Sequence, residues 1–288
     1  MGTMKEKVGI LHPGDMGISV AASAKEGGCT VYWASEGRSQ ETRERAEKHA
    51  LVDASTLAKL CKTCSVVVSV CPPHAAEEVA KGVLAHAFKG LYVDANAISP
   101  RRVIRIGEAM AGSGVALVDA GIIGGPAWKP GSTWMYLAGK EAERVAACFS
   151  AGPLGTEVIG ERIGKASALK MCYAAYTKGT TALLGAILGA AEGLRVREEL
   201  ENQWSRDGSD FAEQAKQRVR GSAAKAWRFI GEMEEIAATF KEAGMPGGFH
   251  TAAADIYRRM DHFKGLKSPP SIEGVLVDLL KAGGRGEK

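Results

Sequence analysis

The chain has 288 residues, of which 45% are hydrophobic and 24% are charged, with a formal net charge of +4. This length and composition are typical of one large globular domain or two ordinary ones with a full hydrophobic core. The charge is mild, and basic pairs such as Arg101–Arg102 and Arg258–Arg259 are short. They favour solvated helix faces over a nucleic-acid interface, so no nucleic-acid partner is expected.

Cysteine usage and hydropathy give two further expectations. Cys61 and Cys64 form a C-x-x-C motif, but no second ligand pair follows at zinc-site spacing. Structural thiols are therefore expected, and no metal. The amino-terminal residues lack the apolar core of a signal peptide, and the longest uncharged run, 179–191, is about half a membrane span. We expect a cytoplasmic protein without a membrane partner.

The first half alternates short β-branched runs with helical patterns. Strands are predicted at 8–11, 30–33, 65–70, 91–94, 115–119 and 133–137, and helices at 18–26, 39–49, 75–84 and 100–110. This alternation favours an α/β domain with a parallel sheet and right-handed crossovers. Residues 1–164 are thus predicted to form a Rossmann domain that binds NAD(P).

The second half loses its strand signals, and residues with helical spacing dominate it. Helices are predicted at 166–197, 211–220, 223–242, 249–260 and 272–281. Residues 165–288 should therefore form an all-α domain for substrate binding and dimerisation. Gly185, Gly189 and Gly193 recur every four residues, which suits close helix packing and a possible subunit contact.

The turn after the first predicted strand is rich in glycine. His12-Pro13-Gly14-Asp15-Met16-Gly17 lies between that strand and a helix. A dinucleotide fold uses glycines there for a tight turn, for close approach of the pyrophosphate and for helix packing. Gly14 and Gly17 occupy the second and third glycine positions, while His12 occupies the first. The pattern favours a cofactor turn over an ordinary strand–helix turn.

The end of the second predicted strand indicates which dinucleotide binds. Glu36 lies where an acid could hold a ribose hydroxyl, and Arg38 with Ser39 could hold a 2′-phosphate. We expect NADP, with NAD as the alternative. In a different reading, Glu36 is a solvated turn residue and Arg38 contacts no ligand.

Lys170 is placed in a long, apolar helical pattern. At α-helical spacing it shares a face with Tyr173, Ala174, Thr177 and Thr181. Desolvation lowers the pKa of a buried lysine, and such a lysine can exchange a proton near neutral pH. The alternative is a surface lysine whose stem packs on the helix.

Taken together, these motifs resemble the β-hydroxyacid dehydrogenases and their 6-phosphogluconate dehydrogenase relatives. The resemblance rests on VGILHPGDMG at 8–17, GRS at 37–39, VCPP at 70–73, VDANAISP at 93–100, DAGIIGGP at 119–126 and GKASALKMCYAA at 164–175. It implies that Lys170 is the catalytic lysine. It also implies a set of cofactor-binding residues: His12, Pro13, Gly14, Asp15, Met16, Gly17, Arg38, Ser39, Cys71, Pro72, Pro73 and Asn96. The implied substrate loop is Gly121, Ile122, Ile123, Gly124 and Gly125.

Departures from the family pattern fall near the expected substrate. Ile123 stands where the family has a serine, and Tyr173 and Ala174 stand where it has two asparagines. These changes remove groups that would hold a small 3-hydroxy acid. Thr177 and His250 are further candidates for substrate binding, and the alternative for His250 is a packing residue.

The sequence therefore predicts a homodimeric NADP-dependent oxidoreductase. Hydride would pass between the nicotinamide and a carbonyl or alcohol carbon of a small molecule, Lys170 would move the proton, and Tyr173 would orient Lys170 or the substrate. One alternative is an imine reductase, in which Tyr173 matters more than Lys170. The other is a non-catalytic nucleotide-binding protein.

Overall fold

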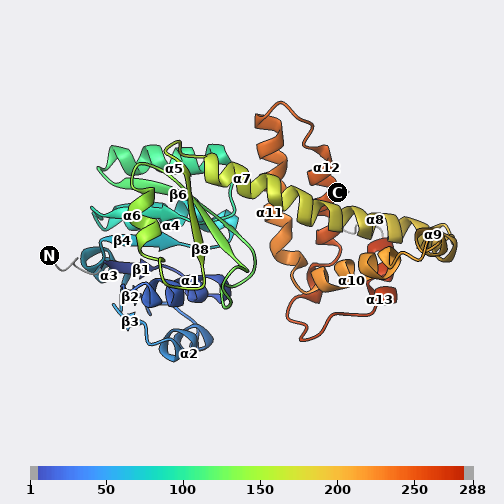
Figure 1. Cartoon of the computed structure of the whole chain (residues 1–288), viewed down its shortest axis with the longest axis horizontal. Coiled ribbons are helices and arrows are strands. Elements are labelled where there is room, and N and C mark those ends of the chain that lie inside the picture. The colour runs from blue at the N-terminus through green and yellow to red at the C-terminus, as the bar shows by residue number, and fades with distance from the viewer. Residues whose placement is uncertain (1–5, 282–288) are drawn as a thin grey trace, which may run out of the picture. The chain divides into compact units, whose positions relative to one another are not determined.

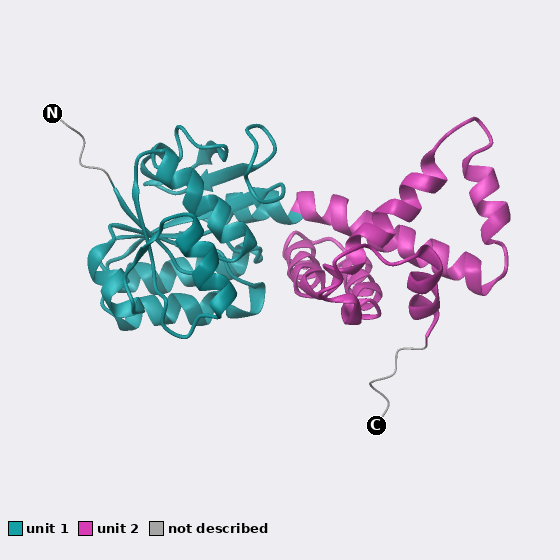
Figure 2. Cartoon of the chain, turned by 90° about the horizontal axis from the view of Figure 1, so that it is seen from below, with its two compact units in different colours: residues 1–171 teal, residues 172–288 magenta. Residues whose placement is uncertain are grey.

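The computed structural model describes residues 6–281 and separates the chain into two compact units (Figures 1 and 2). The division falls between Met171 and Cys172, seven residues after the expected boundary at 164. The first turns of the helix that begins at Lys165 thus belong with the amino-terminal unit, because they pack on its sheet through contacts described below.

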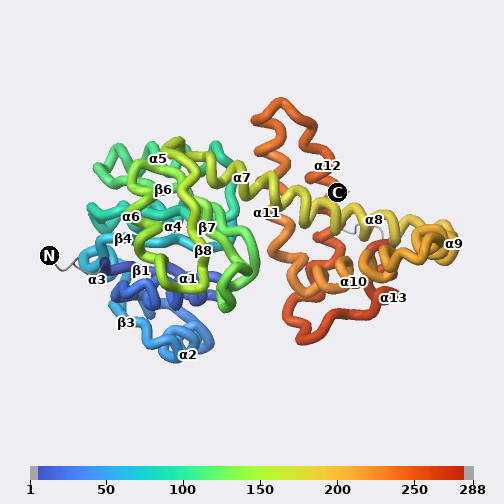
Figure 3. Tube along the Cα trace, viewed as in Figure 1, coloured from blue at the N-terminus to red at the C-terminus, as the bar shows by residue number. Residues whose placement is uncertain are grey.

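The first unit is built on one eight-stranded sheet of order β3-β2-β1-β4-β5-β6-β7-β8 (Figure 1). The strands are β1 Lys7–Ile10, β2 Thr30–Trp33, β3 Val52–Asp53, β4 Val66–Ser69, β5 Leu91–Asp94, β6 Ala116–Ile123, β7 Trp134–Ala138 and β8 Gly155–Gly160. Neighbouring strands are parallel except β6 and β7, which Figure 3 traces as an antiparallel hairpin. The Rossmann prediction is confirmed.

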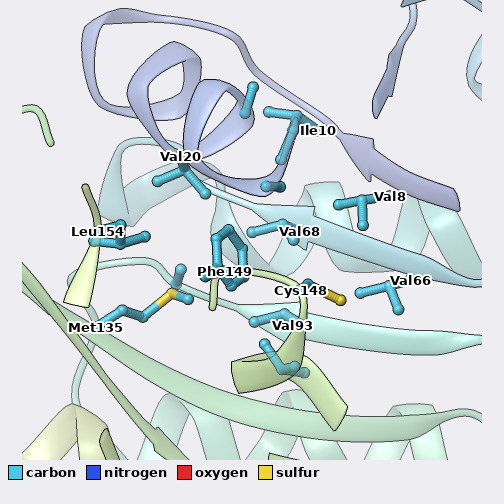
Figure 4. Packing of buried hydrophobic residues seen from close by; sticks show 14 of the residues in the cluster. Val8, Ile10, Val20, Val66, Val68, Val93, Met135, Cys148, Phe149 and Leu154 are labelled. Carbon is cyan, nitrogen blue, oxygen red and sulfur yellow. The ribbon is translucent and has the colours of Figure 1, made fainter. Parts of the chain in front are cut away.

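Helices cover both faces of this sheet. They are α1 Asp15–Glu26, α2 Gln40–Lys48, α3 Leu57–Thr63, α4 Ala76–Ala85, α5 Pro100–Gly112, α6 Ala142–Ala147 and α7 Lys165–Ala174, which runs into the second unit. Successive strand residues point to opposite faces. Val66 and Val68 join Val20 of α1 and Phe149 in one core (Figure 4), whereas Val67 belongs to another core with residues of α3, α4 and α5.

Several elements were not predicted from the sequence. The strand β3 has only two residues, and β8 has the half-buried sequence GTEVIG, which carries no apolar run. The short helices α3 and α6 also escaped prediction. The strand β6 extends four residues beyond the predicted end at 119, to Ile123. This extension carries the sheet directly into the expected substrate loop.

The second unit is helical throughout its described part. It contains α8 Thr180–Gly193, α9 Arg197–Trp204, α10 Phe211–Ala223, α11 Ala226–Glu242, α12 Gly248–Arg258, a short 3₁₀ turn Asp261–Phe263 and α13 Ile272–Leu280. The three glycines of α8 face side chains of this unit. A Cβ on Gly189 or Gly193 would meet Leu279 or Leu280 of α13. The glycine spacing therefore serves packing within the chain.

The single long helix predicted at 166–197 is wrong. A π-helical turn, Ala175–Gly179, separates α7 from α8. Its wider turn shifts the helical phase, so α-helical spacing does not carry one face from Lys170 through Thr177 to Thr181. Arg218 and Tyr257 help to hold the turn, because they donate hydrogen bonds to the carbonyls of Thr177 (3.3 Å) and Lys178 (2.7 Å).

Among residues 6–281, no helix has both the length and the apolar character needed to cross a membrane.

Candidate functional site

Four segments that the sequence analysis identified lie at the carboxyl ends of neighbouring strands, along one side of the sheet. The strands β1, β4, β5 and β6 are adjacent and parallel, so their carboxyl ends share that side. The glycine turn follows β1, Cys71–Pro73 follows β4, Asn96 follows β5, and Gly121–Gly125 completes β6. Chain order reverses between β1 and β4, and this reversal is the place where open α/β sheets bind dinucleotides.

The glycine turn leaves the amino terminus of α1 without a side-chain cap. Gly14 is the N-cap residue, and nothing lies within 4 Å of a Cβ built on it. A Cβ on Gly17 would instead lie 2.0 Å from the carbonyl oxygen of His12. Gly17 therefore permits the close packing of helix and turn, and Gly14 leaves room in front of the first N–H groups. Such a helix end attracts phosphate.

His12 and Arg38 meet beside a cavity of about 230 Å³. The cavity is lined by Leu11, His12, Ala34, Glu36, Arg38, Leu57, Glu78, Val79 and Gly82. Arg38 Nη2 donates to the Leu11 carbonyl oxygen (3.0 Å), whereas Arg38 Nε and His12 Nδ1 are buried without a hydrogen-bond partner. Two unpartnered polar atoms at one cavity are a reason to expect a polar ligand there.

Burial and the nearby Arg38 charge lower the pKa of His12 to about 4. His12 is therefore neutral at pH 7, and its ring adds no charge to the glycine turn. Burial also lowers the pKa of Arg38. Two other residues that were predicted to bind the cofactor make local contacts. Ser39 caps α2 by accepting from Thr42 N (3.3 Å), and Asp15 pairs with Arg45 (3.2 Å).

Asn96 joins the ends of β4 and β5. Its Oδ1 accepts from Cys71 N (2.6 Å), and its Nδ2 donates to Ser69 Oγ (3.1 Å). Its backbone N–H donates to Asp94 Oδ1 (3.1 Å). Burial raises the pKa of Asp94 to about 7. The network fixes the loop after β4, where Pro72 precedes a 3₁₀ turn that starts at Pro73.

Gly121 brings Lys170 against β6. A Cβ built on Gly121 would lie 2.6 Å from the Ala166 carbonyl oxygen and 3.1 Å from Lys170 Cβ. Ile122 points into the core and is 5% exposed. The structure thus places Lys170 beside the substrate loop that the resemblance implied, at the same sheet edge as the glycine turn.

The loop after β6 is connected to α1 by a hydrogen bond. Gly124 adopts φ +123°, a backbone conformation that favours glycine, and Thr133 Oγ1 donates to the Gly125 carbonyl oxygen (2.8 Å). Ala127 N donates to Ser19 Oγ of α1 (2.9 Å). Sequence reasoning missed Ser19, because nothing in a local pattern shows a contact across 108 residues.

Asp119 is the second residue that sequence reasoning missed. This buried carboxylate of β6 accepts hydrogen bonds from the N–H groups of Gly164 (2.8 Å), Ala166 (2.9 Å) and Ser167 (3.1 Å), and from Ser167 Oγ (2.6 Å). All these donors lie at the start of α7. Burial raises the pKa of Asp119 while the donors lower it, and the net direction is upward.

The other candidates, Tyr173, Thr177 and His250, lie in the second unit. Tyr173 is 45% exposed, and its carbonyl accepts from Thr177 Oγ1 (3.2 Å). His250 is buried against Phe240, with ring centroids 4.4 Å apart, and it faces Gly179. Its Nδ1 is buried without a hydrogen-bond partner, and burial lowers its pKa. These contacts give His250 a packing environment next to the π-helical turn.

The C-x-x-C thiols lie at the opposite edge of the sheet. They line a separate cavity of about 570 Å³ together with Lys62, Lys89 and Arg144. Burial raises the pKa of Cys61 to about 11 and of Cys64 to about 12. Within the described part of the chain, no group of three or more His, Cys, Asp or Glu side chains could hold a metal ion.

Comparison with known proteins agrees with this geometry. Residues 7–151 match the model of the NAD binding domain of 6-phosphogluconate dehydrogenase, and residues 191–260 match a domain of unknown function, DUF1932. An uncharacterised 28.5 kDa protein of Methanothermus fervidus is 33% identical over 202 residues, which cover 70% of this chain and 78% of that protein.

Solved structures show the same fold. A conserved protein of unknown function, described as structurally similar to 3-hydroxyacid dehydrogenases, is 31% identical, with a TM-score of 0.67 and coverage of 89% of this chain and 97% of that one. The 3-hydroxyisobutyrate dehydrogenase of Mycobacterium tuberculosis is 18% identical (TM-score 0.69; 96% and 99% covered). An imine reductase variant from Myxococcus stipitatus, in complex with NAD⁺, is also 18% identical (TM-score 0.53; 96% and 100% covered).

The family match spans half of the chain and includes the glycine turn, the β4 loop and Asn96. This chain therefore belongs to the family defined by the NAD binding domain of 6-phosphogluconate dehydrogenase.

Proposed function

We propose that the protein is an NADP-dependent oxidoreductase acting on a carbonyl or alcohol carbon of a small molecule. When bound, the nicotinamide would supply or accept the hydride. Lys170 would donate the proton to the substrate oxygen during reduction and take it back during oxidation. Tyr173 would orient the lysine or the substrate.

One observation carries this proposal: Lys170 and the glycine turn lie at the same edge of one sheet. The turn follows β1, and Lys170 packs on Gly121 near the carboxyl end of β6, in the same rigid framework of parallel strands. A dinucleotide laid across the carboxyl ends of these strands would extend from the turn after β1 toward β5 and β6. Lys170 would lie toward that far end, beside Gly121.

The residues at the turn fit a nicotinamide dinucleotide. The open end of α1 would hold the pyrophosphate, and Gly14 offers the space for it. The guanidinium group of Arg38, which lines the 230 Å³ cavity, would hold the 2′-phosphate of NADP. Glu36 lines the same cavity and would repel that phosphate or bind a ribose hydroxyl. Arg38 would therefore favour NADP, and Glu36 would favour NAD.

The substrate is proposed to lack the small hydroxy-acid character of the usual family substrates. Ile123 replaces a serine in the substrate loop, and Tyr173 and Ala174 replace two asparagines. An apolar side chain and a methyl group leave a carboxylate without partners, which is costly in a desolvated site. A larger, less polar carbonyl compound fits these replacements better.

A panel of carbonyl compounds tests the proposal through NADPH oxidation by the wild type, Lys170→Met and Lys165→Met. Lys165 is the matched control, because it lies on the same helix and is exposed. We expect Lys170→Met to lower kcat by roughly 10²–10⁴-fold with unchanged cofactor affinity, as loss of a general acid–base group does. Lys165→Met should stay near wild type. Near-normal turnover in Lys170→Met would refute the mechanism.

A second candidate is reduction of imines, favoured by the exposed phenol of Tyr173 and by the likeness in fold to an imine reductase. In that chemistry a donor such as Tyr173 would protonate the substrate nitrogen. Tyr173→Phe would then lower turnover of a cyclic imine far more than Lys170→Met does. The reverse order, measured with a ketone, supports the first candidate. No NADPH oxidation with any compound would indicate a non-catalytic nucleotide-binding protein.

The protein is further proposed to act as a cytoplasmic homodimer through its helical unit. Support comes from exposed apolar side chains there, including Leu183, Phe249 and Val277, which are 56%, 79% and 56% exposed. Sedimentation equilibrium should give twice the chain mass. A monomer at micromolar concentration would contradict the dimer.

A further inference from the structure

Asp119 connects the central sheet to the helix that carries Lys170. The first N–H groups of an α-helix have no partner within the helix, and in a buried helix they must be satisfied by another group. At the start of α7, one carboxylate takes the N–H groups of Gly164, Ala166 and Ser167 together with the Ser167 hydroxyl. Charge-assisted hydrogen bonds of this kind are stronger than neutral ones.

Asp119 lies in the middle of β6 rather than on a flexible loop. It is paired with Asp94 of β5 on one side and with Ala138 of β7 on the other. Its backbone therefore has a fixed position in the sheet. Asp119 is fully buried, so its carboxylate has little freedom to follow a displaced helix.

Gly121 provides a second contact on the same face of β6. Residues two apart on a strand point to the same side. Gly121 receives the Ala166 carbonyl and Lys170 Cβ at distances that a side chain on Gly121 would not allow. Asp119 thus fixes the start of α7 by hydrogen bonds, and Gly121 fixes the approach of the helix by contact with Ala166 and Lys170.

We infer that Asp119 is a positioning residue for Lys170, acting through the amino terminus of α7. The inference rests on the proposed role of Lys170. With both contacts on one strand, the helix has a single axial position and a single rotation relative to β6. The position of Lys170 beside Gly121 then follows from the position of the helix.

The test compares Asp119→Asn with Met110→Ala. Met110 lies on α5 and is fully buried in the core. Met110→Ala is therefore a control that lowers stability without removing a hydrogen bond to α7. In Asp119→Asn we expect about tenfold faster amide exchange at 166–170 and a changed rate of Lys170 labelling by an amine-reactive ester. Lys59, exposed on α3, is the internal reference.

With a turned-over substrate, Asp119→Asn should lower kcat by roughly 10–100-fold while the Kd of NADPH stays within about twofold, because misplacement affects the reacting group alone. Met110→Ala, at an equal loss of Tm, should keep its kcat. Ser167→Ala retains the carboxylate of Asp119 and should lower kcat by a smaller factor, again with an unchanged Kd of NADPH. This variant replaces Asp119→Asn in the test if Asp119→Asn does not fold.

Equal exchange and labelling in Asp119→Asn and Met110→Ala would overturn the inference. Exchange and labelling report the position of Lys170 in the absence of substrate. A Lys170→Met variant with normal turnover would instead refute the proposed function and leave the exchange result standing, so the two failures are distinguishable.

Discussion

The helices α1 and α7 differ in what surrounds the N–H groups at their amino termini. The first N–H groups of α1 have no side-chain cap, and the space in front of Gly14 is empty of protein atoms. The first N–H groups of α7 are taken by the buried carboxylate of Asp119. Both ends carry the same partial positive charge.

The difference assigns the two helix ends different tasks. An end without a cap can bind an anion from solution, and this is how a dinucleotide pyrophosphate is held. An end already neutralised by the protein cannot, but it gains a fixed position. We therefore propose that the glycine turn holds the cofactor and that the α7 end positions the side chain of Lys170.

The largest expected contrast is between Gly17→Ala and Gly14→Ala. The Cβ of Gly17→Ala would lie 2.0 Å from a backbone oxygen, so we expect ~3 kcal/mol or more of lost stability by urea unfolding. Gly14 has φ −72° and open surroundings, so Gly14→Ala should keep its stability within ~0.5 kcal/mol and lose affinity for NADPH. Equal stability losses in the two variants would remove the distinction between packing glycine and ligand glycine.

Gly121→Ala tests the α7 side of the comparison. The added methyl would push on the Ala166 carbonyl and on Lys170, so the helix must shift. A displacement near 1 Å costs roughly 10²-fold in rate when it moves a catalytic group. Steady-state kinetics should show this loss in kcat with an unchanged NADPH Kd. A variant that loses cofactor affinity instead would place Gly121 in the nucleotide site.

Cofactor preference should respond to the two side chains at the 230 Å³ cavity. Arg38→Ala removes the donor proposed for the 2′-phosphate, so the Kd of NADPH should rise roughly 10–100-fold and that of NADH much less. Glu36→Gln removes a negative charge from the same cavity and should lower the Kd of NADPH. If Arg38→Ala weakens the binding of NADPH and NADH equally, Arg38 only stabilises the conformation of the turn.

The smallest effects concern the pH dependence of stability. The pKa of His12 is lowered from 6.5 to about 4, so between these values the unfolded chain binds the extra proton and His12 makes stability rise with pH. The pKa of Asp94 is raised from 3.8 to about 7, so there the folded chain binds the extra proton and Asp94 makes stability fall with pH.

These two dependences oppose each other throughout the range from about pH 4 to 6.5. Relative to wild type, Tm should fall with rising pH in His12→Gln and rise in Asp94→Asn. Thermal unfolding across this range measures both slopes. Parallel Tm curves for the variants and the wild type would show that neither group titrates as the structure indicates.

Local patterns sufficed for six of the eight strands and for the loops proposed to bind the cofactor. The β-branched runs and the turn at His12–Gly17 can each be recognised from a few consecutive residues. The parallel strands then bring their carboxyl ends to one side of the sheet. Asp119 could not be found this way, because its role depends on a helix that begins 46 residues later. Its only local signal, an acid within an apolar strand, also fits a satisfied core residue.

The π-helical turn at 175–179 was beyond reach for a similar reason. Its sequence, AYTKG, continues an α-helical pattern, and its form depends on Arg218 and Tyr257, which come from α10 and α12. The partner of Arg38 also depends on tertiary structure. The sequence predicted a residue for the cofactor, but the hydrogen bond to the Leu11 carbonyl and the unpartnered Nε appear only in the fold.

The central claim is that the open end of α1 holds a nicotinamide dinucleotide. A fluorescence titration of the wild type and Gly14→Ala with NADPH and NADH tests it most directly. We predict saturable binding by the wild type, tighter for NADPH than for NADH, and a loss of binding in a Gly14→Ala variant that unfolds like the wild type. Absence of saturable binding by the wild type, or equal affinity in Gly14→Ala, would contradict it.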